Sequence, residues 1–83
     1  MEIFYAKKAA EELTDLSREI QKRIAKKMRF YATQRDPLKF AKRLTDCRDG
    51  EFRFRIGKYR VLFDVKKETI FVLKIDNRDK SYD

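Results

Sequence analysis

The stretch EFRFRIGKYRVLFDV, residues 51–65, decides the fold because it contains two alternating patterns on either side of a glycine. Apolar and polar side chains alternate before and after Gly57, which is the period of a half-buried β-strand. A two-residue loop that begins with glycine is typical of a β-hairpin. The sequence therefore predicts an antiparallel hairpin in which Ile56 faces Tyr59 and Arg55 faces Arg60.

The polar face of this predicted hairpin is rich in arginine. Arg55 would lie directly opposite Arg60, and Arg53 would lie two residues away on the same face. Like charges that oppose each other across a ladder are unfavourable by roughly 0.2–1 kcal/mol per pair. The pattern indicates a binding site for an anion, and the alternative is a solvated strand face without a ligand.

The remaining periodic segments complete the predicted fold. The predicted elements are strands over 2–5 and 69–76, helices over 7–16 and 18–33, and one helical turn around 40–44 within an ordered loop, 38–49. In the last strand we expect Phe71, Leu73 and Ile75 to face the core. The order β-α-α-β-β-β predicts one α+β domain, residues 1–83, with a helical hairpin on one face of a small, mostly antiparallel, four-stranded sheet.

The composition restricts the chemistry that the chain can perform. Its 83 residues carry 22 Lys and Arg against 14 Asp and Glu, and the net charge of +8 suits a polyanion or an acidic protein. The chain has no histidine, and Cys47 is its single cysteine. This excludes His-based or Cys-based metal sites, an internal disulfide, and Ser-His or Cys-His catalysis. No apolar run is long enough for a signal peptide or a membrane span, so we expect a cytoplasmic protein.

Further basic residues lie outside the hairpin, on the long helix, in the loop that follows it and on the last strand. We expect these residues to form a landing surface for nucleic-acid phosphates. They are Lys22, Lys26, Arg29, Lys39, Lys42, Arg43 and Lys74. For the helical members the alternative is ordinary solvation.

Four stretches of the chain resemble the RelE/ParE superfamily of toxins from type II toxin–antitoxin systems. Residues 52–63, FRFRIGKYRVLF, are similar to the hairpin motif of that family, and residues 72–82, VLKIDNRDKSY, are similar to its closing segment. Residues 4–16 and the Asp36-Pro37-Leu38 connection, followed by residues 42–44, match in the same order. The resemblance spans nearly the whole chain and implies the same β-α-α-β-β-β fold.

The resemblance implies one of two activities. RelE-like members are endoribonucleases that cut mRNA in the ribosomal A site, whereas ParE-like members inhibit DNA gyrase. Carried over by position, the RelE-like catalytic residues are Arg53, Arg55, Arg60, Arg78 and Tyr82. Tyr82, four residues after Arg78, favours the RelE-like branch. A third alternative is a toxin-fold protein that has lost its activity and binds RNA or protein.

Two departures from the family pattern bear on this site. Asn77 stands where many relatives have histidine, and the hairpin carries arginines where some active members have lysines. Because the pKa of arginine lies above about 12, these side chains can stabilise charge but hardly act as bases.

The resemblance also implies the partners of the protein. They are an antitoxin, whose acidic and partly disordered segment folds across the toxin, and the ribosome with its mRNA. The basic residues outside the hairpin would then bind RNA or the ribosome. We expect neither a metal nor another cofactor to be required, since the 2′-hydroxyl of RNA can itself attack the adjacent phosphate.

Overall fold

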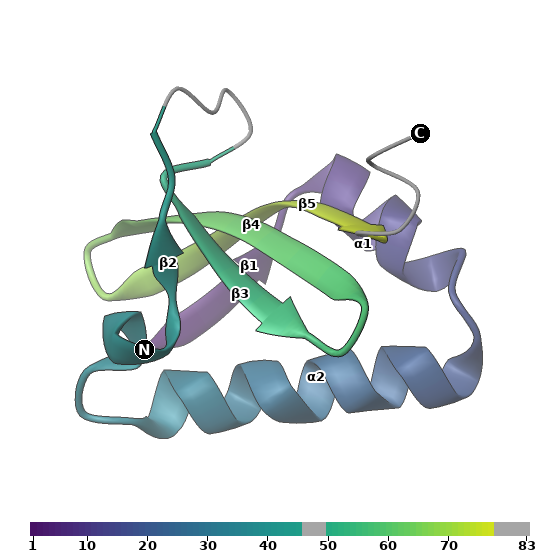
Figure 1. Cartoon of the computed structure of the whole chain (residues 1–83), viewed down its shortest axis with the longest axis horizontal. Helices are drawn as coiled ribbons and strands as arrows, with labels where there is room; N and C mark the ends of the chain where they lie inside the picture. The colour runs from purple at the N-terminus through teal and green to yellow at the C-terminus, as the bar shows by residue number, and fades with distance from the viewer. Residues whose placement is uncertain (46–49, 78–83) are drawn as a thin grey trace.

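The computed structural model describes residues 1–45 and 50–77, in which two α-helices and a short 3₁₀-helix accompany a five-stranded sheet (Figure 1). The elements are β1 (Glu2–Tyr5), α1 (Lys7–Thr14), α2 (Arg18–Thr33), the 3₁₀-helix η1 (Pro37–Phe40), β2 (Lys42–Arg43), β3 (Phe52–Ile56), β4 (Tyr59–Lys66) and β5 (Thr69–Asn77). Apart from η1 and β2, this is the predicted order, and the predicted α+β class is confirmed. Within this part of the chain, no helix is both long and apolar enough to cross a membrane.

The sheet has the strand order β1-β5-β4-β3-β2. Strand β1 pairs in parallel with β5, and the other neighbouring strands pair antiparallel. The register of the β3–β4 hairpin is the predicted one, with Ile56 opposite Tyr59 and Arg55 opposite Arg60. The turn between the two strands contains Gly57 with a φ of 60°, a left-handed conformation that glycine adopts without steric cost.

The prediction of four strands was wrong by one, because residues 42 and 43 pair with the outer edge of β3. This edge would otherwise expose unpaired backbone groups, and the pairing continues as the backbone N–H of Leu44 donates to the carbonyl oxygen of Glu51 at 2.8 Å. The helical turn lies earlier than predicted, over η1. Its position follows from Pro37, because the fixed φ of proline favours the first turn of a helix.

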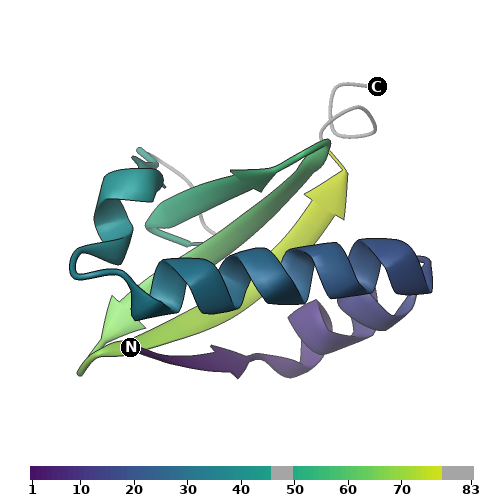
Figure 2. The ribbon, with the colours of Figure 1, turned by 90° about the horizontal axis from the view of Figure 1, so that it is seen from below.

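Both α-helices cover the same face of the sheet, as Figure 2 shows. Helix α2 begins after Ser17, whose side chain accepts a hydrogen bond from the backbone N–H of Ile20 at 3.4 Å and so caps the helix. Stacked rings join the two layers. The centroid of Tyr31 on α2 lies 4.2 Å from that of Phe54, and the centroid of Phe54 lies 4.3 Å from that of Phe63.

Helix α1 completes the hydrogen bonding of β5 beyond the end of β1. The backbone N–H of Ala6 donates to the carbonyl oxygen of Val72 at 2.8 Å. Further along β5, the Oε1 atom of Glu12 accepts a hydrogen bond from the backbone N–H of Ile75 at 3.0 Å. A helical carboxylate thus takes the place of a neighbouring strand.

Strand β5 contains an irregularity that the sequence pattern does not reveal. Leu62 on β4 lies opposite Lys74, but the next residue, Phe63, lies opposite Val72. Leu73 is therefore an extra residue on β5, which is the geometry of a β-bulge.

The bulge changes which residues of β5 face the core. Ile75 is buried as predicted, and Ile70 and Val72, for which no prediction was made, are also buried. The prediction for Phe71 and Leu73 was wrong, and both are only partly buried. A one-residue insertion shifts the period-2 alternation by one step, so the residues before it exchange faces.

Candidate functional site

The face of the sheet opposite α1 and α2, here called the open face, carries two rows of mainly charged side chains. Residues that lie opposite each other in neighbouring strands share a face, so the register defines both rows. The first row contains Lys42, Arg53, Leu62 and Lys74. The second row contains Arg55, Arg60 and Asp76. These two rows therefore gather five cations and one carboxylate from four adjacent strands.

Arg60 and Asp76 form a bidentate ion pair in the second row. The Nε atom of Arg60 donates to Oδ1 of Asp76 at 2.8 Å, and its Nη2 atom donates to Oδ2 at 2.7 Å. Both side chains are largely shielded, with relative exposures of 24% and 18%. This pair offsets the repulsion that Arg55 exerts on Arg60, and it fixes the plane of the Arg60 guanidinium. The sequence analysis did not identify this pairing of Arg60 with Asp76.

The predicted catalytic residues are only partly covered by the described residues. The structure brings Arg53, Arg55 and Arg60 together on the open face, as predicted. Arg53 and Arg60 are partly buried, whereas Arg55 is exposed. Arg78 and Tyr82 lie outside the described residues.

The other predicted RNA-binding residues do not form one surface. Lys42 and Lys74 belong to the first row of the open face, and Lys74 is partly buried there. The remaining five are exposed but lie elsewhere: Lys22, Lys26 and Arg29 on α2, Lys39 on η1, and Arg43 opposite Phe52 on β2. Helix α2 packs against the other face of the sheet, here called the covered face. Its basic residues and the open face are therefore separate surfaces (Figure 2).

The open face also has an apolar end, where the bulge directs two side chains of β5. A hollow of about 260 Å³ is lined by Asp64, Lys66, Phe71 and Leu73. The ring of Phe4 on β1 lies beside it, with its centroid 5.6 Å from that of Phe71 and a tilt of 59°. At the rim, Oδ1 of Asp64 accepts a hydrogen bond from the backbone N–H of Glu51 at 2.8 Å.

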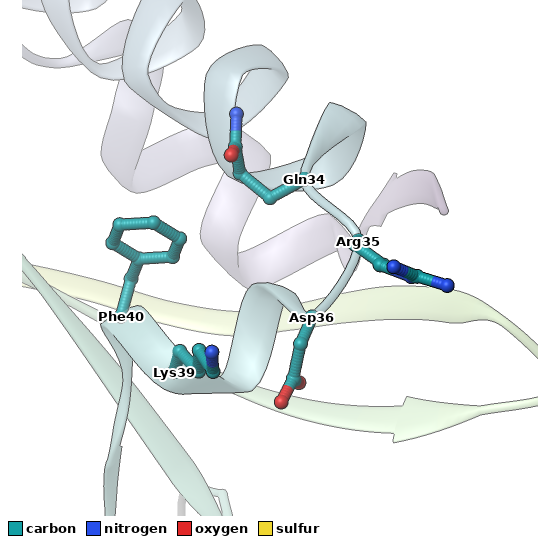
Figure 3. Close-up of a pocket in the computed structure, with 5 residues that line it drawn as sticks. All are labelled: Gln34, Arg35, Asp36, Lys39 and Phe40. Carbon is teal, nitrogen blue, oxygen red and sulfur yellow. The ribbon is translucent and has the colours of Figure 1, made fainter.

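A second hollow lies where α2 meets η1, on the helical side of the molecule. Figure 3 shows the five residues that line it: Gln34, Arg35, Asp36, Lys39 and Phe40. Its rim is aromatic, because the ring centroids of Phe40 and Phe30 are 5.8 Å apart. This hollow is not continuous with the two rows, so we do not assign it to the same site.

Two tyrosines on the helical side, Tyr5 and Tyr31, have a raised pKa. Burial raises the pKa of both Tyr5 and Tyr31 above the ordinary value of 10.0, and the positive charge of Arg29 partly opposes this for the pKa of Tyr5. Neither hydroxyl can therefore act as a base near neutral pH. Over residues 1–45 and 50–77, no group of three or more His, Cys, Asp or Glu side chains is placed to hold a metal ion. Cys47 lies outside these residues.

Comparisons with known proteins identify a family and a fold. The family model for the ParE toxin of the type II toxin–antitoxin system parDE matches residues 3–82. Among curated proteins there is no match. A solved chain from the RelBE2 toxin–antitoxin complex of Mycobacterium tuberculosis is 26% identical with a TM-score of 0.75, and the match covers 93% of this chain and 90% of that chain.

Two archaeal structures are also similar. The match to the RelE–RelB complex of Pyrococcus horikoshii OT3 has 24% identity and a TM-score of 0.73, covering 93% of each chain. The match to the RelB–RelE antitoxin–toxin complex of Methanococcus jannaschii has 24% identity and a TM-score of 0.68, covering 96% of this chain and 95% of that chain. At this identity, the two likenesses establish the fold alone.

Proposed function

Because the chain belongs to the RelE/ParE superfamily of type II toxins, we propose that it is a ribosome-dependent mRNA endoribonuclease that an antitoxin restrains. The observation that carries this proposal is the gathering of cations on the open face. Arginine donates to phosphate oxygens in a bidentate manner, and lysine adds a point charge. A surface of this kind, on a sheet face that the helices leave uncovered, suits the backbone of single-stranded RNA.

The proposed reaction is an attack of the RNA 2′-hydroxyl on the adjacent phosphorus. A bond forms between the 2′-oxygen and phosphorus, the bond to the 5′-oxygen breaks, and the products are a 2′,3′-cyclic phosphate and a 5′-hydroxyl. Negative charge accumulates on the phosphate oxygens in the transition state. Arg53, Arg55 and Arg60 would stabilise that charge, and the ion pair with Asp76 would keep Arg60 oriented for it.

Two residues outside the described part of the chain complete the proposal. Arg78 would add a further phosphate ligand, and Tyr82 would stack on a base or take part in proton transfer. Arginine cannot serve as the base at neutral pH, so the rate would depend mainly on positioning and electrostatics. We therefore expect the ribosome to supply much of the positioning and free RNA to be a poor substrate.

The proposed partners follow from charge and from the solved relatives. The three similar structures described above are toxin–antitoxin complexes, and a net charge of +8 suits an acidic antitoxin segment. The exposed cations on the helical side and at β2 would contact ribosomal RNA. They are Lys22, Lys26, Arg29, Lys39 and Arg43. In this proposal residues 1–83 act as one domain in the cytoplasm.

A second candidate function is inhibition of DNA gyrase without RNA cleavage. It is favoured by the family model that matches the chain, which describes ParE toxins. A gyrase inhibitor would not depend on the charge of Arg60. The two candidates therefore differ in what a neutral residue at this position would do to toxicity.

Primer extension on a reporter mRNA tests the first candidate, with the protein added either to programmed ribosomes or to free RNA. We expect cuts within A-site codons only when ribosomes are present. Arg60→Ala should abolish the cuts, whereas Arg35→Ala, an exposed arginine on the helical side, should not. An absence of wild-type cuts together with blocked gyrase supercoiling would replace the first candidate with the second.

A further inference from the structure

The bulge in β5 joins an aromatic hollow to the cationic rows, and we propose that this hollow binds a nucleobase of single-stranded RNA. The inference deepens the proposed function and rests on RNA as the ligand of the open face. Its starting point is the exchange of faces on β5. Without the extra residue Leu73, Phe71 would lie in the core instead of beside the cations.

The lining of the hollow has the chemistry that a base requires. Phe71 and Leu73 provide an apolar floor, and Phe4, which is 56% exposed, adds a second ring against which a base can stack. Asp64 and Lys66 provide a carboxylate acceptor and an ammonium donor at the edge. Exocyclic amino groups and carbonyl oxygens of bases pair with such groups.

The position of the hollow fits a nucleotide whose phosphate lies on the first row. Asp64 and Phe71 lie opposite each other, and the pair Leu62 and Lys74 is the next pair along the same face. Two residues of a strand span about 6.6–6.8 Å, so the hollow and the cations are one side-chain row apart. The negative charge of Asp64 disfavours a phosphate in the hollow itself. The arrangement therefore orients the nucleotide, with its phosphate on the cations and its base on the rings.

The observations favour a base over a protein segment as the occupant. An amphipathic helix docks with several apolar anchors at i, i+3, i+4 and i+7, which requires a continuous apolar groove. Here the hollow is about 260 Å³, below the roughly 300–1,000 Å³ of sites that enclose drug-sized ligands. It is bounded by charged side chains, namely Asp64, Lys66 and the nearby Lys74. A single planar group fits this outline better than a helix.

The test compares binding of a short fluorescein-labelled oligoadenylate with binding of its abasic counterpart, which has the same length and charge. Fluorescence anisotropy with the full chain gives the ratio of the two dissociation constants, which isolates the contribution of the bases. We expect wild-type protein to bind the oligoadenylate about tenfold more tightly, a typical gain from one stacked base. Phe71→Ala should bring the ratio close to one, whereas Phe71→Tyr, which keeps an aromatic ring, should give the wild-type ratio.

Two further variants make the outcome decisive. Phe30→Ala removes an exposed ring from the helical side and should leave the ratio unchanged. Phe71→Leu preserves apolar volume but lacks the ring, so it should also lower the ratio, even if the alanine variant does not fold.

Several results would overturn the inference: no binding of the oligoadenylate, a ratio near one in wild type, or a ratio that Phe71→Leu does not change. If Phe71→Ala weakens only the binding of an acidic antitoxin peptide, the hollow belongs to a protein partner instead. The ratio needs no cleavage, so a protein that fails to cut mRNA could still confirm the base site. Conversely, cleavage with a ratio near one would retain the proposed function and reject this inference.

Discussion

The two faces of the sheet are built from the same strands, yet they place opposite demands on the sequence. On the covered face the side chains of Phe54, Val61 and Phe63 are fully buried and are packed by the helices. On the open face the same strands present cations, of which Arg60 is held by Asp76. The difference teaches that the alternation of a strand separates two roles. The positions that face the helices stabilise the fold, and the positions between them can be selected for binding.

The largest effect is expected from breaking the covered face. Phe54→Ala removes a ring that is 0% exposed and that stacks between Tyr31 and Phe63. Loss of a buried phenylalanine costs about 3–5 kcal/mol, a large part of the stability of a small domain. Urea denaturation followed by circular dichroism measures this loss. The neighbouring Arg55→Ala, on the open face, should change the free energy of unfolding by less than about 0.5 kcal/mol.

The next largest effect is expected on cleavage, from a substitution on the open face. Arg60→Ala should lower ribosome-dependent cleavage about 10²–10³-fold, because it removes a donor to the transition-state charge. Its effect on the melting temperature should be smaller than that of Phe54→Ala, because the ion pair that it breaks still has some contact with solvent. Parallel cleavage and thermal-melting assays measure both quantities. A large loss of stability with normal cleavage would assign Arg60 to the fold.

A smaller and more selective effect is expected from Asp76→Ala. Without its carboxylate the guanidinium of Arg60 is no longer oriented, so we expect the cleavage rate at saturating substrate to fall about tenfold. The two rows would lose their one carboxylate and become more positive. RNA should therefore bind more tightly, and the salt dependence of binding should become steeper. Opposite changes in rate and affinity separate a positioning role from a general loss of structure. Asp36→Asn, an exposed carboxylate on the helical side, provides the control.

The smallest effect concerns pH and the covered face alone. Burial raises the pKa of Tyr5 and Tyr31 in the folded chain above 10.0, so both tyrosines stabilise the fold fully below that pH. Above pH 10.0 the unfolded chain loses these protons first, and stability should fall. Comparing denaturation from pH 8 to 11 for wild type and for Tyr31→Phe isolates one contribution. The same dependence of stability on pH in both proteins would contradict a contribution from Tyr31.

Local patterns predicted much of the fold. The hairpin register follows from alternation and the helix over residues 18–33 from helical spacing, and both are confirmed. Sequence alone did not reveal the bulge at Leu73, because an inserted residue leaves an apolar run that is equally consistent with regular alternation. It also missed β2, whose two residues are too few to show a period.

The arginines of the candidate site were predictable from the sequence, but their contacts with other strands were not. Arg53, Arg55 and Arg60 follow from the hairpin register, which is a local property of the sequence. The pairing of Arg60 with Asp76 depends on how β5 aligns with β4, and the apolar hollow depends on the bulge within β5. Both are long-range consequences of packing, and no short window of sequence contains them.

The parallel pairing of β1 with β5 has a consequence for the order of folding. Glu2 pairs with Thr69 and Tyr5 pairs with Val72, so β1 cannot pair until residues 69–72 have been synthesised. The antiparallel hairpins of β3, β4 and β5 need only short loops to close, whereas this contact must close a long one. We therefore expect β1 to dock late, after the antiparallel hairpins have formed. A growing chain that lacks residues 69–72 would then be unable to assemble its complete sheet.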